Sequence, residues 1–360
     1  MPKICILSTV NLIHMTLISL YTDFLEINNI EYDIIHIDKY GQFEDNNANR
    51  IYPYRIVIDS NWTKLKKLRK YYGFKKYAIN LILNNKYEYI VVWNSYTAIL
   101  FSSFLSKKYK QKFVLNIRDY SLEKFLPVYL IMKKVIKNSF FTTVSSNGFK
   151  RFLPRHNYIF VNSMNASLLK NIEKRNEKRD DFKPIRISFI GYVRFYENDI
   201  KLINLLGNDA RFVIQYFGQG SDKLQKYCEE NGIKNVNFHG RFDKSQTLNF
   251  LEQTDIINNL YGSGKIELDT AISIKFYYSI SYQIPILVDS NTYMEDLIKK
   301  YDVGLSIDWN IDNLSDCIFD WYRNLNYQKY IENCEMLCKK IEEENLEFQD
   351  QFKTFLVTDD

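Results

Sequence analysis

The amino-acid sequence predicts an α/β protein made of two doubly wound, Rossmann-like domains in series. The chain of 360 residues is longer than a single hydrophobic core usually allows. Short runs rich in Ile and Val alternate with amphipathic segments, as in a parallel sheet with helices on both faces. A highly charged segment at residues 166–184 interrupts this alternation, which then starts again. We therefore expect two domains joined by a linker at this segment.

The first domain is expected to cover residues 1–165. Its opening patterns predict a strand over 3–9 and a helix over 11–29. A further helix is predicted over 97–110, and further strands over 31–38, 89–94, 113–119 and 140–145. Helix patterns that lie between strand patterns favour a parallel sheet.

The second domain is expected to cover residues 185–326. Its strands are predicted over 185–191, 211–218, 236–240, 255–261, 284–289 and 303–308, each followed by a helical pattern. Residues 327–360 predict a polar helical tail that we expect to cross back to the first domain. In open α/β sheets ligands bind beyond the carboxyl ends of the strands, so the residues after each strand are the candidates for a site.

Charge and cysteine content indicate which partner surface and which cellular compartment to expect. The net charge of +5 conceals roughly +15 over residues 1–180 and roughly −10 over the remainder. A basic half suggests an anionic partner surface, either a membrane or a nucleic acid. The five cysteines are scattered and odd in number, which disfavours a zinc site or a disulfide framework and fits a reduced cytoplasmic setting. No secretory signal is expected at the start of the chain.

The first strand of the second domain is followed by a candidate phosphate site. Gly191 ends this strand, Arg194 follows, and a helix is expected from about residue 197. Backbone N–H groups at a helix start favour an anion, and arginine can add a bidentate contact. Gly218 and Gly220 similarly follow the next strand, without the third glycine of a dinucleotide fingerprint. The alternative interpretation is a pair of ordinary turns and a solvated arginine.

A later helix, expected over about 270–283, carries Ser273 and Lys275 near its first turn. Lysine is unfavourable at a helix N-terminus unless an anion neutralises it, so Lys275 weakly supports a bound phosphate. The alternative is a lysine that reaches solvent.

In chain order these segments resemble the nucleotide-sugar domain of a GT-B glycosyltransferase. The segments that carry the resemblance are GYVR, YFGQGS, VNFHGR, DIINNLY and KFYYSISYQIPILV. Among such enzymes they are most similar to the retaining family 4 type of bacterial capsular and exopolysaccharide synthesis. The resemblance covers residues 185–310 well and the first half only by architecture. It implies the GT-B fold, with two Rossmann-like domains facing a cleft.

The resemblance assigns roles to the candidate residues. Arg194 and Lys275 match residues that stabilise the donor diphosphate. Gly191 matches the glycine that admits the backbone to the donor, and Gly218 and Gly220 match the turn that lines the base pocket. Ser273 accompanies Lys275 on the donor side of the helix.

One position departs from the family pattern. Tyr278 stands where a ribose-binding glutamate is usual, and position 270, eight residues earlier, is Thr in place of a second glutamate. Glu267 and Asp269 lie close in sequence and could substitute. A tyrosine hydroxyl can still hydrogen-bond a ribose, although without a charge.

In the first half, Asp119 follows a predicted strand and is a candidate for orienting the acceptor hydroxyl. The alternative is an Asp that caps the next helix. Asn11 and His14 follow the first strand and are further candidates for the acceptor side.

Residues 61–83 combine Lys and Arg with aromatic residues, which suits an anionic membrane surface. A solvated helix face is the alternative, and nucleic acid is not expected because no nucleic-acid-binding motif is present.

The resemblance implies a retaining hexosyltransferase whose donor, a nucleotide sugar expected to be linked to UDP, is a substrate, with no further cofactor. No D-x-D motif occurs in the chain, so we expect metal-independent transfer. The expected acceptor is a saccharide carried on polyprenyl diphosphate, at the cytoplasmic face of the plasma membrane. Two alternatives remain open: a non-catalytic partner subunit of a glycosyltransferase, and a nucleotide-sugar epimerase of the same architecture.

Overall fold

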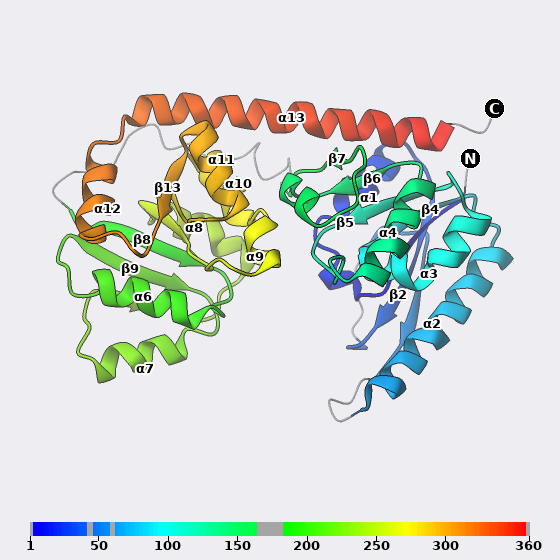
Figure 1. Cartoon of the computed structure of the whole chain (residues 1–360), viewed down its shortest axis with the longest axis horizontal. Coiled ribbons are helices and arrows are strands. Elements are labelled where there is room, and N and C mark those ends of the chain that lie inside the picture. Colours follow the sequence, from blue (N-terminus) through cyan, green and yellow to red (C-terminus); the bar gives the residue numbers. More distant parts are fainter. Residues whose placement is uncertain (1–2, 42–45, 58–61, 164–182, 358–360) are drawn as a thin grey trace. The chain divides into compact units, whose positions relative to one another are not determined.

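The structure is a computed structural model that describes residues 3–41, 46–57, 62–163 and 183–357 (Figure 1). The chain divides into two compact units. Unit 1 comprises Met1–Asn165 and Glu343–Asp360, and unit 2 comprises Ala166–Glu342. Most of the predicted linker, residues 166–182, lies outside the described residues.

Unit 1 contains a seven-stranded sheet in the order β3-β2-β1-β4-β5-β6-β7. All of its pairings are parallel. The strands are β1 (Ile4–Ser8), β2 (Tyr32–Asp38), β3 (Arg50–Arg55), β4 (Tyr89–Trp93), β5 (Phe113–Ile117), β6 (Thr142–Val144) and β7 (Ile159–Phe160). The helices are η1 (Leu12–His14), α1 (Ser19–Ile27), α2 (Lys64–Asn84), α3 (Ser95–Lys108), α4 (Leu126–Asn138) and η2 (Asn147–Arg151).

Unit 1 differs from the sequence prediction at one helix and at both edges of its sheet. The helix predicted over 11–29 is interrupted, because Leu17 has a left-handed φ of 64° that separates η1 from α1. The edge strands β3 and β7 were not predicted. β3 contains Pro53, which is tolerated there because an edge strand does not need every backbone donor for pairing.

Unit 2 contains a six-stranded sheet in the order β10-β9-β8-β11-β12-β13, the strand order of a doubly wound Rossmann sheet. The strands are β8 (Ile185–Ile190), β9 (Phe212–Phe217), β10 (Val236–Phe238), β11 (Ile256–Asn259), β12 (Ile286–Asp289) and β13 (Gly304–Ile307). All six were predicted from the sequence. The helices are α6 (Tyr196–Leu206), α7 (Asp222–Glu230), η3 (Lys244–Gln246), α8 (Thr247–Glu252), α9 (Ile266–Thr270), α10 (Ile274–Tyr282), α11 (Tyr293–Tyr301) and α12 (Leu314–Arg323).

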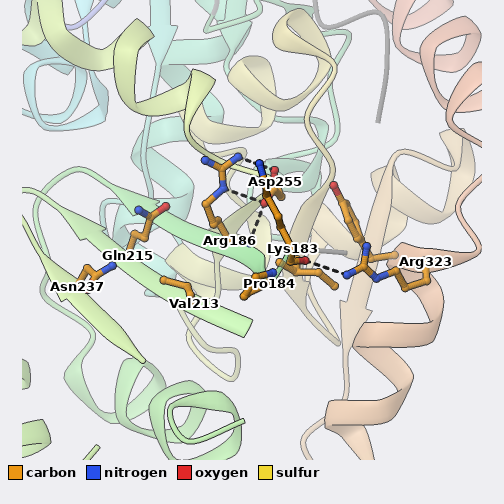
Figure 2. Close-up of a pocket in the computed structure, with 10 residues that line it drawn as sticks. Lys183, Pro184, Arg186, Val213, Gln215, Asn237, Asp255 and Arg323 are labelled. Carbon is orange, nitrogen blue, oxygen red and sulfur yellow. Dashed lines mark hydrogen bonds and ion pairs between the residues drawn. The ribbon is translucent and has the colours of Figure 1, made fainter. Parts of the chain in front are cut away.

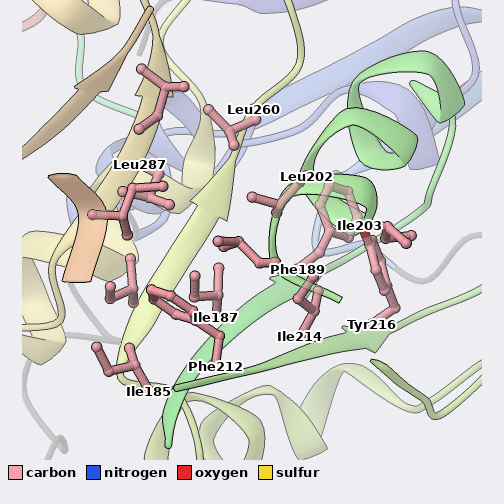
Figure 3. Close-up of a cluster of buried hydrophobic side chains, with 14 of the residues drawn as sticks. Ile185, Ile187, Phe189, Leu202, Ile203, Phe212, Ile214, Tyr216, Leu260 and Leu287 are labelled. Carbon is pink, nitrogen blue, oxygen red and sulfur yellow. The ribbon is translucent and has the colours of Figure 1, made fainter. Parts of the chain in front are cut away.

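The hydrophobic core of unit 2 follows from the alternation of side chains along its strands. Ile187 and Phe189 of β8 lie on the same face as Ile214 of β9, because side chains two residues apart point the same way. This face packs against Leu202 and Ile203 of α6 (Figure 3). The packing fixes the start of α6 beside the carboxyl ends of β8 and β9.

The long helix α13 (Tyr327–Val357) contributes to both units. Its residues up to Glu342 belong to unit 2, and those from Glu343 belong to unit 1. In unit 1, Phe352 packs edge-on against Tyr21 with ring centroids 5.3 Å apart, and Phe355 packs against Tyr89 at 4.7 Å. No helix among the described residues is both long enough and apolar enough to cross a membrane.

Candidate functional site

The candidate site lies at the carboxyl end of the second sheet, where two glycine turns pack against each other. A Cβ atom at Gly218 would lie 1.8 Å from the carbonyl oxygen of Gly191, and one at Gly220 would lie 2.5 Å from that of Val193. The φ angles of these three glycines, between 94° and 145°, also exclude side chains. The turns therefore require glycine for their own packing. They leave a bare backbone surface directly after β8 and β9.

Lys275 lies beside this surface and does not reach solvent. Its residue is 2% exposed, and its Nζ lies 3.8 Å from the ring centroid of Phe189 and 4.6 Å from that of Tyr261. The same Nζ donates a hydrogen bond to the Tyr261 hydroxyl. It also lies 4.0 Å from the position that a Cβ of Gly191 would occupy. A buried cation, enclosed by two aromatic rings, thus borders the Gly191 turn.

Ser273 positions Lys275 through the backbone. Its Oγ accepts a hydrogen bond from the Lys275 backbone N–H at 3.2 Å and so caps α10. The helix consequently begins at Ile274, and not at residue 270 as predicted, since residues 266–270 form the separate helix α9. The role that the structure shows for Ser273 is therefore to cap α10.

Two buried aspartates accompany Lys275, and sequence reasoning missed both as site residues. Asp199 of α6 is 2% exposed, and its Oδ1 accepts a hydrogen bond from the Tyr216 hydroxyl at 3.1 Å. Burial raises the pKa of Asp199 to about 7, against the opposing effects of Tyr216 and of the charge on Lys275. This carboxyl therefore changes protonation near neutral pH.

The second aspartate, Asp289, ends β12. Its Oδ2 accepts from the Gly262 backbone N–H at 2.7 Å, and its Oδ1 accepts from Nε1 of Trp309 at 3.0 Å. Burial raises the pKa of Asp289, and these hydrogen bonds and the charge of Lys201 oppose the shift. The available signal was its position as the last residue of a buried strand.

Arg194 is exposed in the turn before α6. Its Cζ lies 5.1 Å from the ring centroid of Phe195, which packs against Tyr261 at 4.9 Å. Arg194 and Lys275 are thus linked through two aromatic rings at the same end of the sheet. The guanidinium stands at the start of α6, whose N-cap makes no side-chain hydrogen bond. Cation and helix start both favour an anion at this place.

The three residues considered for the ribose lie on α9 and α10. Tyr278 is half-buried, and burial raises its pKa. Asp269 braces its own loop, since its Oδ1 accepts a hydrogen bond from the Gly264 backbone N–H at 2.8 Å. Glu267 is exposed. Position 270 points inward, because the Thr270 hydroxyl is buried and donates to the Ile266 carbonyl at 2.6 Å.

In unit 1, Asp119 is exposed shortly after β5. The alternative that it caps the next helix is wrong, because α4 begins at Leu126 and its N-cap is Phe125. In the turn after β1, Nδ2 of Asn11 donates to Oδ1 of Asp38, the last residue of β2, at 3.1 Å. His14 lies in η1, the short helix that follows Asn11, and its Nε2 lies 2.8 Å from the Tyr40 hydroxyl.

A hollow of about 390 Å³ lies at the opposite, amino end of the second sheet (Figure 2). Arg186 and Asp255 form a bidentate ion pair in its wall, with both N–O distances 3.0 Å, and Nη2 of Arg323 donates to the Lys183 carbonyl at 2.9 Å. None of the sequence-predicted site residues lines it. Among the residues that the structure describes, no group of three or more His, Cys, Asp and Glu could hold a metal ion.

No protein-family model matches the chain, and no curated protein matches it. Solved structures do match over nearly the whole length. Sucrose-phosphate synthase from Thermosynechococcus elongatus has a TM-score of 0.74 at 10% identity and covers 99% of both chains. The Anabaena protein HepE in complex with UDP has a TM-score of 0.68 at 11% identity and covers 98% of this chain and 100% of its own. The lipopolysaccharide outer core galactosyltransferase WaaB has a TM-score of 0.59 at 13% identity and covers 98% and 99%.

At these identities the likeness concerns the fold. The likeness extends over nearly the full length of the chain, and both units of the chain contain the parallel sheet of a Rossmann-like domain. The chain therefore has the fold of the GT-B glycosyltransferases, with two parallel-sheet, Rossmann-like domains.

Proposed function

We propose that the chain is a glycosyltransferase that moves a sugar from a nucleotide sugar, with UDP as the nucleotide, to a saccharide acceptor. The observation that carries the proposal is the buried Lys275 ammonium beside the bare backbone of the Gly191 turn. A buried cation is costly unless an anion or hydrogen bonds compensate it, and the carboxyl end of a parallel sheet is where such folds bind ligands. A diphosphate at this place would supply the anion. HepE, which is similar in fold, was solved with UDP and with UDP and glucose.

In the proposed reaction, Arg194 and Lys275 stabilise the departing diphosphate, and the transfer is retaining and needs no metal ion. The acceptor hydroxyl attacks from the face of the leaving group, and the diphosphate takes its proton. Asp119 orients that hydroxyl. Removing one such electrostatic contact typically lowers the rate about 100- to 1000-fold.

The ribose contact is proposed to come from the Tyr278 hydroxyl, with Glu267 as the accompanying carboxylate. Asp269 is the weaker candidate because its Oδ1 already accepts the Gly264 N–H. The turn glycines Gly218 and Gly220 would border the base.

The acceptor is proposed to be a saccharide on polyprenyl diphosphate, used in bacterial capsular or exopolysaccharide synthesis at the cytoplasmic face of the plasma membrane. Support comes from the basic, aromatic α2, in which Nζ of Lys66 lies 4.3 Å from the Trp62 ring centroid. This combination suits an anionic interface.

The test is calorimetric titration of the whole chain with UDP, followed by transfer and hydrolysis assays with UDP sugars. Lys275→Ala and Arg194→Ala should each lower the transfer rate about 100- to 1000-fold while the protein stays folded. Lys226→Ala, at an exposed lysine of α7, is the matched control and should behave as wild type. Near-normal turnover of Arg194→Ala and Lys275→Ala would refute the assignment.

A non-catalytic partner subunit is the second candidate. The observation that favours it is the tyrosine at position 278, where the resemblance places a carboxylate. UDP binding without hydrolysis or transfer by the isolated chain would support this candidate. An epimerase is separated by its product, since it converts a nucleotide sugar without any acceptor.

A further inference from the structure

The helices on one face of the first sheet form a layer without acidic residues. We define this basic layer as α2, α3 and α4, of which α3 packs against both others (Figure 1). The three helices contain seven, two and three Lys or Arg residues respectively, and no Asp or Glu. The whole chain carries 43 Asp and Glu, so their exclusion from this layer indicates a surface that meets negative charge.

Large apolar side chains are exposed at the rim of the basic layer. Four of them lie within nine residues, in the loop before α4 and in its first two turns, and each is 55–65% exposed: Leu122, Phe125, Leu126 and Leu130. Tyr96 at the start of α3 is 53% exposed, and Leu65 in the first turn of α2 is 79% exposed. Each of these three helices follows a strand of the parallel sheet. The three helix starts therefore lie at the same end of the sheet, where the strands have their carboxyl ends. Exposed apolar groups gathered in this way mark interaction surfaces.

The loop before α4 turns apolar side chains outward against the usual preference. Leu122 is exposed and has a φ of 68°, in the left-handed region that a leucine rarely adopts. Its neighbour Glu123 is fully buried, and its Oε2 accepts a hydrogen bond from the Ser121 backbone N–H. A loop folded for stability alone would bury the leucine and expose the glutamate. The loop instead leaves both Leu122 and Phe125 exposed.

We propose that the basic layer and this apolar rim dock the protein on an anionic lipid bilayer. The rim side chains would enter the boundary between headgroups and acyl chains, and Lys133, Lys134 and Lys137 of α4 would meet lipid phosphates. Apolar side chains beside three helices that carry Lys and Arg but no Asp or Glu fit such a bilayer, because burial and charge then act at the same interface. The proposal extends the membrane contact from α2 to the start of α4, which the sequence did not indicate. It rests on the proposed function only for the idea of a lipid-carried acceptor.

The test is co-sedimentation of the full chain with vesicles, of phosphatidylcholine alone or with about one-third phosphatidylglycerol. Binding should require the anionic lipid and weaken as salt rises. The double variant Phe125→Ser with Leu126→Ser should lower vesicle affinity at least about tenfold, since each side chain contributes by apolar burial. Lys133→Glu with Lys134→Glu should lower it similarly.

Ile27→Ser is the matched control. Ile27 is 79% exposed at the end of α1, whose crossover places it on the other face of the sheet. This variant should bind vesicles as the wild type does. Equal binding of the Phe125 double variant and wild type would overturn the proposal, as would equal binding to neutral and anionic vesicles, or none to either. UDP binding, measured on the same variants, should stay unchanged, so that failure here is distinct from failure of the proposed transfer.

Discussion

The buried carboxyl of Asp199 predicts that replacing it with asparagine stabilises the protein at alkaline pH and not at acidic pH. The pKa of this group is raised from 3.8 to about 7 in the folded chain. Between these two values the folded state holds a proton that the unfolded state has released. Stability therefore falls as pH rises from about 4 to about 7, by about 4 kcal/mol in all.

The replacement Asp199→Asn isolates the effect of charge, because the asparagine side chain is nearly isosteric with the protonated acid. It keeps an oxygen that can accept the Tyr216 hydroxyl, at 3.1 Å in the wild type, and it stays neutral at every pH. The stability of the variant relative to wild type should rise by about 3 kcal/mol between pH 5 and pH 8. A change of that size corresponds to roughly 6–12 °C in the relative melting temperature of a unit this large.

Differential scanning calorimetry of the full-length pair at pH 5 and pH 8 measures this difference, and the titrating groups that do not interact with Asp199 cancel between the two proteins. Asp209→Asn provides a control whose effect on stability at pH 8 has the opposite sign. The Arg211 guanidinium, 2.6 Å from Oδ2 of Asp209, holds the pKa of that carboxyl well below its usual range. Its contribution is present at neutral pH and lost as pH falls below about 4, so this variant should be destabilised at pH 8. Parallel melting curves for wild type and Asp199→Asn would refute the reasoning.

Three further predictions concern the Gly218 turn, Lys275 of α10 and the loop before α4. Gly218→Ala should destabilise the chain by at least about 2 kcal/mol in thermal unfolding, because its Cβ would overlap the Gly191 carbonyl at 1.8 Å, and an unchanged melting temperature would contradict this packing. Lys275→Ala should lower UDP affinity more than about tenfold in calorimetry, whereas Lys226→Ala should not, and equal affinities would remove Lys275 from the site. Leu122→Gly should cost less than about 1 kcal/mol, since φ is left-handed and the side chain is exposed, whereas truncating a buried leucine costs about 2–5 kcal/mol.

Much of the second unit could be predicted because its signals are local. Strand runs such as IRISFI are apolar and β-branched over the length of one strand, and all six of that sheet were found in this way. The first unit was harder. β3 contains Pro53, which argues against a strand until its edge position is known, and the helix predicted over 11–29 is interrupted by a left-handed leucine that no local pattern indicates.

The candidate site was likewise predictable only in part. The glycines after β8 and β9 and the basic residues near them were visible in the sequence, because strand ends can be read from local patterns. The partners of Lys275 were not. Tyr261 precedes it by 14 residues and Asp199 by 76, and they approach it only because β8 and β11 are neighbours in the sheet although two strands separate them in the chain.

The sequence by itself determined the strand pattern, the glycine turns and the excess of positive charge in the first half. Only the tertiary structure decided that Lys275 is buried against Phe189, and that Glu123 lies inside while Leu122 lies outside. The physical reason is that apolar periodicity is a property of consecutive residues. The burial and pKa of a charged side chain depend instead on atoms that the fold brings from distant strands.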